Sequence, residues 1–217
     1  LDEVVGAIKT IHQTYPHEWQ FLAGFSLGGN FALRVAAKAD EAGLSIRKTV
    51  GICPVVDPAK TMMALESGWW VYEKYFVRKW QKSLQKKIRL YPELGYKDNL
   101  LKLKTLREMN SYFIPNHTPF TSIEDYFKAY NIAGAALETL SSPTHIIATQ
   151  DDPIILAEDF SRLATNEHLH IETKQYGGHC GFVKNYQLES WLDERLAELI
   201  NLNRYPSGDP AKGAHSQ

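Results

Sequence analysis

A Gly-x-Ser-x-Gly segment centred on Ser26 constrains the fold of this chain more than any other feature of the sequence. It follows a short apolar run, residues 19–25, and precedes an Ala- and Leu-rich stretch, residues 30–43, that is typical of a helix ending at a glycine. The segment therefore predicts a sharp turn between a buried strand and a helix. We expect this turn to require glycine at positions 24 and 28, because so tight a turn leaves no room for side chains beside the serine.

At such a turn Ser26 would present its hydroxyl at a helix N-terminus, where the helix dipole favours developing negative charge. The backbone N–H of Leu27 would then be one donor of an oxyanion hole. The alternative is a Gly-rich turn in which Ser26 only caps the helix. Phosphate-binding motifs do not match, because Asn30 stands where a P-loop requires Lys and no G-x-G-x-x-G occurs.

The rest of the chain predicts an α/β fold with a mostly parallel sheet and a helical insertion. Runs of strand length and composition recur at residues 47–55, 143–149 and 168–174. Helical patterns cover residues 1–15, 153–164 and 188–202. Residues 61–130 show no convincing strand, and they contain helical stretches near 99–109 and 122–130. We expect residues 1–202 to form one domain and residues 203–217, which are polar and contain Pro and Gly, to be a disordered tail.

Candidates for an acid and a base follow the later predicted strands. A serine hydroxyl needs a neighbouring base, and the base needs a carboxylate that orients it. Asp151 and Asp152 follow one strand and His179 follows the next, so all three are expected at the sheet edge that carries Ser26. We favour Asp152 as the acid and keep Asp151 as the alternative, because Asp152 also fits an ordinary helix N-cap before a proline.

The remaining histidines and the cysteines predict no metal site and no cofactor. With only Cys53 and Cys180, the chain has neither a disulfide framework nor a four-thiolate site. His168 and His170 alternate on one strand face without an evident third ligand. Cys180 could be a thiol nucleophile, but it has no base of its own at a familiar spacing. We interpret it as a small buried residue.

Charge limits the partners that the chain can bind. Lys plus Arg number 24 and Asp plus Glu number 25, which argues against nucleic acid. Residues 71–90, however, contain seven Lys or Arg and one Glu, and aromatic residues at 69, 72, 76 and 80 share one helical face. This segment is either a lid that makes a weak contact with an anionic membrane surface, or a helix with its aromatic face on the core and its lysines in water. No apolar run is long enough to span a membrane and no signal peptide is evident, so we expect a cytoplasmic protein.

Three segments resemble the YheT-type branch of the α/β-hydrolases, also called the AB hydrolase 4 group: GFSLGGN at 24–30, DDP at 151–153 and GGHCGF at 177–182. The resemblance covers about residues 1–202 and implies an α/β-hydrolase fold with a helical cap at about 61–130.

The resemblance also implies a serine hydrolase acting on carboxylic esters, with Ser26 as nucleophile, Asp152 as acid and His179 as base. Some relatives act on phospholipids or transfer acyl groups to alcohols. An alcohol O-acyltransferase using the same site is therefore one alternative, and a non-catalytic binding protein of the same fold is another.

Two departures from that family matter. Members have about four strands and an oxyanion loop before the nucleophile strand, whereas this sequence starts at a helix leading into that strand. We expect the chain to be a C-terminal portion of a longer hydrolase, with the second oxyanion donor outside these residues. Loss of one such donor costs about 10²–10³ in rate. Residues 107–111 also differ from an acidic stretch that is usual near the end of the cap.

Overall fold

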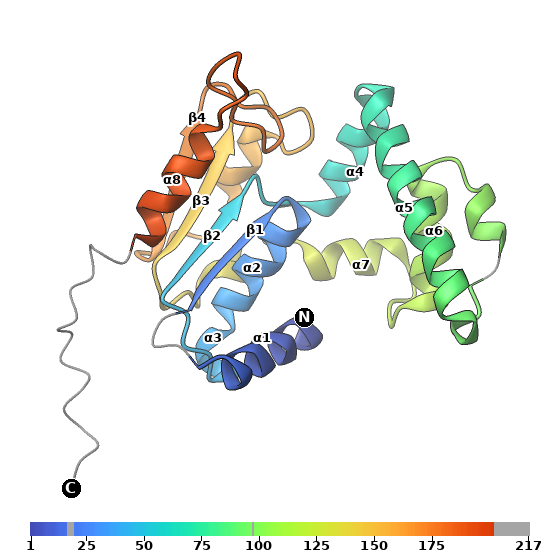
Figure 1. Ribbon diagram of the computed structural model, residues 1–217, viewed down its shortest axis with the longest axis horizontal. Coiled ribbons are helices and arrows are strands. Elements are labelled where there is room, and N and C mark those ends of the chain that lie inside the picture. The colour runs from blue at the N-terminus through green and yellow to red at the C-terminus, as the bar shows by residue number, and fades with distance from the viewer. Residues whose placement is uncertain (17–19, 97, 202–217) are drawn as a thin grey trace, which may run out of the picture. The chain divides into compact units, whose positions relative to one another are not determined.

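The computed structural model describes residues 1–16, 20–96 and 98–201, so the tail predicted at 203–217 lies outside the described residues. Figure 1 shows the helices and strands along the chain. In order they are α1 (Asp2–Thr14), β1 (Phe21–Phe25), α2 (Leu27–Ala37), α3 (Ala39–Ala42), β2 (Lys48–Ile52), α4 (Pro58–Ser67), α5 (Trp70–Leu90), α6 (Leu106–His117), α7 (Ile123–Tyr130), β3 (Thr144–Thr149), β4 (Leu169–Lys174) and α8 (Trp191–Ile200). Short 3₁₀ helices lie at Pro92–Leu94, Asp98–Lys102, Ala135–Leu137 and Ala157–Arg162.

The chain divides into two compact units, Leu1–Cys180 and Gly181–Gln217. The first unit contains all four strands and the helical insertion. In the described part of the second unit, an isolated antiparallel bridge pairs Val183 with Ser190. Ser190 also caps α8, because its side chain accepts a hydrogen bond from the backbone N–H of Leu192.

The four strands form one parallel sheet in the order β1-β2-β3-β4 (Figure 1). Every residue of β2 is buried, whereas β1 and β4, at the two edges, are partly exposed. Because all four strands run in the same direction, their carboxyl ends meet at one edge of the sheet. The predicted parallel sheet interrupted by a helical insertion is therefore confirmed.

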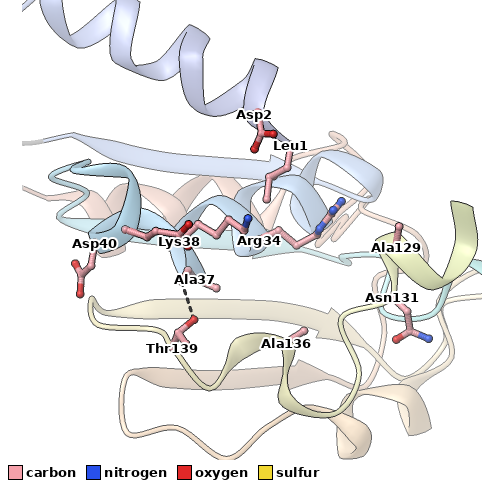
Figure 2. Close-up of a pocket in the computed structure, with 11 residues that line it drawn as sticks. Leu1, Asp2, Arg34, Ala37, Lys38, Asp40, Ala129, Asn131, Ala136 and Thr139 are labelled. Carbon is pink, nitrogen blue, oxygen red and sulfur yellow. Dashed lines mark hydrogen bonds between the residues drawn. The ribbon is translucent and has the colours of Figure 1, made fainter. Parts of the chain in front are cut away.

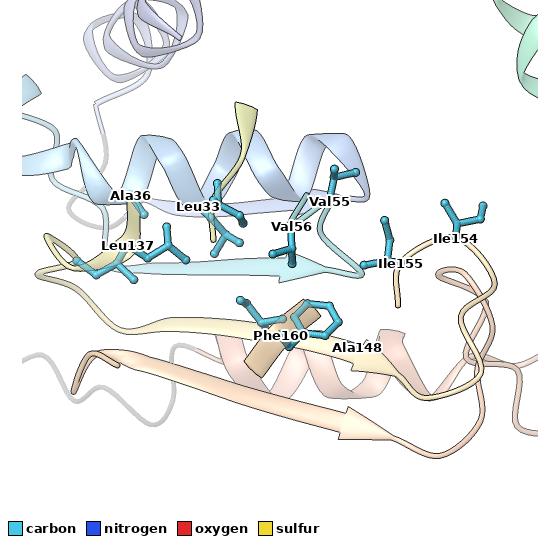
Figure 3. Close-up of a cluster of buried hydrophobic side chains, with 12 residues drawn as sticks. Leu33, Ala36, Val55, Val56, Leu137, Ala148, Ile154, Ile155 and Phe160 are labelled. Atoms are coloured by element: carbon cyan, nitrogen blue, oxygen red, sulfur yellow. The ribbon is translucent and has the colours of Figure 1, made fainter. Parts of the chain in front are cut away.

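The main apolar core fastens α2 to the sheet, and Figure 3 shows its side chains converging between α2 and the strands. Leu33 on α2 is fully buried and lies against Gly51 of β2, where an added Cβ would meet the Leu33 Cδ1 at 3.2 Å. This close packing holds the helix whose N-terminus follows Ser26. The buried members are Leu33, Ala36, Val55, Val56, Ile132, Leu137, Leu140, Ile146, Ala148, Ile154, Ile155 and Phe160.

The insertion, α4 to α7, has an apolar cluster of its own, formed by Met62, Val77, Leu84, Leu100, Leu106 and Met109. Of the four aromatic residues predicted to share one face, Tyr72, Phe76 and Trp80 pack against this cluster or the main core. Trp69 does not, and it is 77% exposed. It is the N-cap of α5 with an extended ψ of 115°, so the helical periodicity does not extend to it.

α5 carries the basic segment, and all seven of its Lys and Arg residues are exposed. Lys74 lies over the ring of Trp70 at 4.3 Å, and Lys79 lies over Tyr75 at 5.4 Å. Across the residues that the structure describes, no helix combines the length and the apolar character needed to cross a membrane.

The helix predicted near 99–109 is wrong in its boundaries. Asp98–Lys102 is a 3₁₀ helix, and α6 begins only at Leu106. The cause is a capping box: the Thr105 side chain accepts from the Glu108 N–H while the Glu108 carboxylate accepts from the Thr105 N–H. Such a pair starts a helix, so the chain before it follows a different path.

The helix predicted at 153–164 is also wrong, since only the 3₁₀ helix Ala157–Arg162 forms there. Ile154 and Ile155 are adjacent and both are buried in the main core. Leu156 is extended, with ψ 132°, which interrupts any helix after them. Burial of two neighbouring isoleucines therefore decides the local structure against the helical pattern.

Candidate active site

Ser26 occupies the turn between β1 and α2 in a backbone conformation rare for a serine, with φ 51° and ψ −119°. Its N–H donates to the carbonyl of Ile52 at 2.8 Å, which fastens the turn to β2. The turn is so tight that a Cβ on Gly24 would lie 2.2 Å from the Gly28 carbonyl oxygen. Backbone strain of this kind is characteristic of functional sites and persists only when the surroundings impose it.

The steric expectation for the glycines is confirmed for Gly24 and wrong for Gly28. A Cβ at Gly28 would meet nothing within 4 Å. Gly28 contributes its backbone, which is what approaches Gly24. The second position that needs a glycine is Gly29, where a Cβ would lie 2.9 Å from the Gly24 oxygen and 3.0 Å from the Cβ of Pro54.

The structure brings together the three side chains that the sequence singled out. His179 Nδ1 lies 2.8 Å from Asp152 Oδ2, and its Nε2 lies 2.9 Å from Ser26 Oγ. A neutral imidazole protonated on Nδ1 donates to the carboxylate and accepts the serine hydroxyl proton on Nε2. Ser26 follows β1, Asp152 follows β3 and His179 follows β4, so the common sheet edge places all three.

The Asp152 carboxylate makes two kinds of contact, one with each of its oxygens. Oδ2 pairs with His179, while Oδ1 accepts from the N–H groups of Ile154 and Ile155 at 2.8 and 3.0 Å. The side chain is only 2% exposed. The two amides thus fix the carboxylate that holds the imidazole.

Asp151 instead binds the loop that carries the histidine. Its carboxylate accepts from the N–H groups of Gly178 and Gly177 at 2.8 and 3.2 Å. Burial would raise the pKa of Asp151, but these amides hold it below its ordinary value. Thr149, which the sequence analysis missed, adds a hydrogen bond from Oγ1 to the Gly178 carbonyl at 2.9 Å. The sequence feature that could have predicted this role is a hydroxyl residue at the last position of an apolar strand.

In sequence, the chain is weakly similar to abhydrolase domain-containing proteins. It is 22% identical over 92% of its length to phospholipase ABHD3 of Homo sapiens, covering 50% of that protein. It is also 22% identical over 83% of its length to an abhydrolase domain-containing protein of Dictyostelium discoideum, covering 47% of it. The chain thus spans about half the length of the curated relatives it matches, and no family model matches it.

In structure, the chain resembles two hydrolases. The esterase Pf2001 of Pyrococcus furiosus superimposes with a TM-score of 0.51 at 14% identity, over 93% of this chain and 60% of that one. The α/β hydrolase MGS-MChE2, from a lagoon-sediment metagenome, gives 0.52 at 17% identity, over 94% and 71%. The chain has a partial α/β-hydrolase fold. In such a fold the Gly-x-Ser-x-Gly turn, the aspartate and the histidine occupy loops at the carboxyl edge of the sheet.

The environment of His179 in this hydrolase fold favours its protonated form. Burial alone would lower the pKa of His179, but the hydrogen bond with Asp152 and the neighbouring sulfur of Cys180 raise it to about 9. The imidazole therefore accepts a proton readily once it is neutral. Because of the same raised pKa, the neutral imidazole becomes the dominant form only at alkaline pH.

α2 supplies two further groups at the turn of residues 24–28, which we call the hydrolase elbow. Leu27 is the first residue of the helix, so its N–H has no acceptor within the helix and points toward the space beyond the helix end. Asn30 is fully buried, and its Nδ2 donates to the carbonyls of Val55 and Tyr130 at 2.8 and 2.7 Å. Asn30 thus anchors the elbow helix to two distant loops. The sequence feature that could have predicted this role of Asn30 is a polar residue on an otherwise apolar helix face.

Two thiols lie beside the histidine, and the sequence analysis did not foresee this. Ligand atoms of Cys53, His179 and Cys180 all lie within 4.8 Å of one another. Cys180 is only partly buried, contrary to expectation, whereas Cys53 is completely buried. Both nitrogens of His179 already pair with Asp152 and Ser26. The expectation of no metal site stays a prediction.

A cavity of about 750 Å³ lies along the C-terminal half of α2, on the side of the helix that Figure 2 shows. Arg34 and Lys38 line it, and the Arg34 guanidinium stacks on the ring of Tyr130 at 4.4 Å. None of Ser26, Asp152 and His179 is among its lining residues. This cavity is therefore separate from the hydrolase elbow.

Proposed function

We propose that this chain carries a serine hydrolase site that cleaves carboxylic esters through an acyl-enzyme. One observation carries the proposal: the His179 ring joins the Asp152 carboxylate to the Ser26 hydroxyl at hydrogen-bond distances. In this proposal Ser26 is the nucleophile, His179 the general base and acid, and Asp152 the orienting acid. The esterase and phospholipase names of similar proteins support the ester class.

The reaction follows from this geometry. Ser26 Oγ attacks the ester carbonyl carbon while His179 Nε2 takes the hydroxyl proton. The carbonyl oxygen becomes an oxyanion, toward which the Leu27 N–H donates. His179 then gives its proton to the departing alkoxide, leaving Ser26 acylated. Water, deprotonated by the same imidazole, releases the acid and restores the serine.

Asp152 keeps the imidazole in the productive tautomer and stabilises the imidazolium that forms at each proton transfer. Its own oxygens are fully engaged by His179 and by the amides of Ile154 and Ile155. Asp151 acts as a positioning residue, since its partners are the amides of the loop that precedes His179.

For the substrate we propose acyl esters, either of lipids or of short- to medium-chain acids, and we propose that the chain belongs to the YheT-type branch that its motifs resemble. The name phospholipase belongs to the similar human protein, which is 22% identical to this chain over the 214 aligned residues. Acyl transfer to an alcohol uses the same site and the same acyl-enzyme. Product analysis of one ester substrate, with and without added alcohol, separates hydrolysis from transfer.

We further propose that the N-terminal end of α5 makes a weak contact with an anionic lipid surface. Trp69 and Trp70 are 77% and 66% exposed, and exposed lysines and arginines follow them along the helix. Co-sedimentation with vesicles that contain phosphatidylserine should exceed that with phosphatidylcholine alone, and it should fall in Trp70→Ser. Equal sedimentation with both vesicles contradicts this contact.

The decisive experiment is the intact mass of the purified protein after treatment with a fluorophosphonate, beside Ser26→Ala. Such a probe reacts with an activated serine and spares ordinary exposed ones. We expect a single adduct that disappears in Ser26→Ala and in His179→Ala. A folded protein that forms no adduct would favour the non-catalytic binding protein and overturn the proposal.

A further inference from the structure

Cys53 and Cys180 are the only cysteines in the chain, and they lie far apart in the sequence. The fold nevertheless places both sulfurs and a ligand nitrogen of His179 within 4.8 Å of one another. Cys53 directly follows β2, and Cys180 directly follows the histidine of the hydrolase site. The proposed mechanism uses neither thiol.

The two thiols differ in exposure and in pKa, as a cysteine that reacts with an oxidant differs from the cysteine that then forms the disulfide with it. Cys53 is 0% exposed, whereas Cys180 is only partly buried. The neighbouring sulfur of Cys180, together with burial, raises the pKa of Cys53. The neighbouring Cys53, helped by His179, lowers the pKa of Cys180 to about 6 despite its burial. A thiolate is the form of sulfur that attacks an oxidant.

Both cysteines are also tied to the serine turn through one carbonyl. The Ile52 oxygen accepts from the Ser26 N–H at 2.8 Å and from the Cys180 thiol at 3.9 Å. Cys53 is the next residue after Ile52, and it has a positive φ of 42°, while Cys180 has φ 68°. A shift of Cys53 therefore moves its neighbour Ile52, and a shift of Cys180 moves its neighbour His179.

We propose that Cys53 and Cys180 form a peroxide-sensitive dithiol whose oxidation to an intramolecular disulfide switches off the hydrolase site. Cys180 is the sulfur that reacts with peroxide, and Cys53 is the thiol that resolves it. The second half of this statement, the loss of activity, rests on the proposed function. The disulfide itself does not.

The chemistry balances with one peroxide molecule per disulfide. The Cys180 thiolate attacks one oxygen of hydrogen peroxide, the O–O bond breaks, and hydroxide leaves, giving a sulfenic acid. The Cys53 sulfur then attacks the Cys180 sulfur, the S–O bond breaks, and water leaves after taking the Cys53 proton. Two thiols lose two electrons in total, and the peroxide is reduced to two waters.

The inhibitory effect has a geometric cause. A disulfide holds its sulfurs about 2 Å apart, so the two loops must draw together from their present spacing. Cys180 carries its chain neighbour His179 with it, and Cys53 carries Ile52. Displacement of the imidazole from Ser26 and Asp152 stops proton transfer, since small misplacements of catalytic groups cost large factors in rate.

The test measures the disulfide and the serine separately. The reduced protein is treated with equimolar hydrogen peroxide, denatured with N-ethylmaleimide, and weighed intact. We expect the mass to fall by two hydrogen atoms with no maleimide added, and a non-reduced digest to contain a peptide joining Cys53 to Cys180. Cys53→Ser should instead accumulate a sulfenic acid that dimedone traps. Cys180→Ser should react at least roughly tenfold more slowly.

Fluorophosphonate labelling of Ser26 is followed in the same samples. We expect labelling to fall at least about tenfold as the disulfide forms and to return with dithiothreitol. If the peroxide-treated protein still takes up two maleimides, or forms sulfinic acid without a disulfide, the proposed dithiol is wrong. A disulfide that leaves labelling unchanged overturns the switch. No labelling of the reduced protein contradicts the proposed function instead, while the mass still decides the disulfide.

Discussion

The carboxyl edge of the sheet and the helical insertion are built on different principles. At the edge, three loops supply Ser26, Asp152 and His179, and Ser26 is separated from the other two by more than a hundred residues. Hydrogen bonds shorter than 3 Å join the three side chains. The insertion is made of helices consecutive in sequence that share an apolar cluster. Its surface carries exposed tryptophans and lysines. The edge is thus defined by polar contacts between distant residues, and the insertion by amphipathic packing between near ones.

Substitutions should therefore act differently in the two regions. A change at the edge alters a contact that no neighbouring residue can replace, so its effect depends on individual atoms. A change in the insertion removes apolar area that surrounding side chains partly refill, so its effect scales with burial.

The largest expected effect distinguishes the two aspartates. Asp152→Asn should lower kcat/KM by about 10⁴, because the amide no longer holds His179 in the productive tautomer. Asp151→Asn should lower it less than about tenfold, since that carboxylate contacts only loop amides and removes no reacting group. Steady-state hydrolysis of a p-nitrophenyl ester measures both. Equal losses in the two variants would make Asp151 part of the reacting unit.

The next effect concerns the glycines of the elbow. Gly24→Ala places a methyl group 2.2 Å from the Gly28 oxygen, and it should lower the free energy of unfolding by about 3 kcal/mol or more. Gly28→Ala meets nothing within 4 Å and should change the free energy of unfolding by less than about 1 kcal/mol. Urea denaturation followed by circular dichroism compares them. Similar midpoints would show that the turn relaxes around the methyl group.

In the insertion, burial should decide the outcome. Met109→Ala removes a fully buried side chain and should cost about 2–3 kcal/mol of unfolding free energy. Trp70→Ala, at a site 66% exposed, should change it by less than about 0.5 kcal/mol. Hydrogen exchange of the α6 amides locates the Met109 effect. A Trp70 variant as unstable as the Met109 variant would reveal a buried environment for that tryptophan.

The smallest effect is a shift in pH dependence. In the proposed mechanism neutral His179 is the base, so activity should rise with pH through the folded-state pKa, which lies at about 9. Cys180→Ser removes a group that raises this pKa, while the Asp152 partner stays. The acidic limb of the kcat/KM profile should therefore move to lower pH. An unmoved limb would show that Asp152 alone sets the proton affinity of the imidazole.

Much of the site was predictable because parallel strands bring their following loops to one edge. Ser26, Asp152 and His179 could be placed together from the order of strands and turns alone. The glycine at 24 followed from the tightness of the turn. The boundaries of α6 were also available in principle, since Thr105 and Glu108 have capping-box spacing.

Other features were not predictable in the same way. A helix was expected after Asp152, but burial of Ile154 and Ile155 in a core assembled from distant elements overrode the local pattern. The aromatic face of α5 was expected to include Trp69, but the helix begins one residue later. The first of these errors arose where tertiary packing, rather than neighbouring residues, selects the conformation.

The turn at Ser26, the parallel α/β architecture and the order of serine, aspartate and histidine could be derived from sequence alone. These depend on residues close together in the chain, whose steric limits and apolar periodicity act locally. Only the tertiary structure decided that Asp152 both caps a turn and holds the histidine. Only it placed Cys53 beside Cys180. Contacts of that kind depend on strand register and loop closure, which bring distant residues together at one point of the sheet.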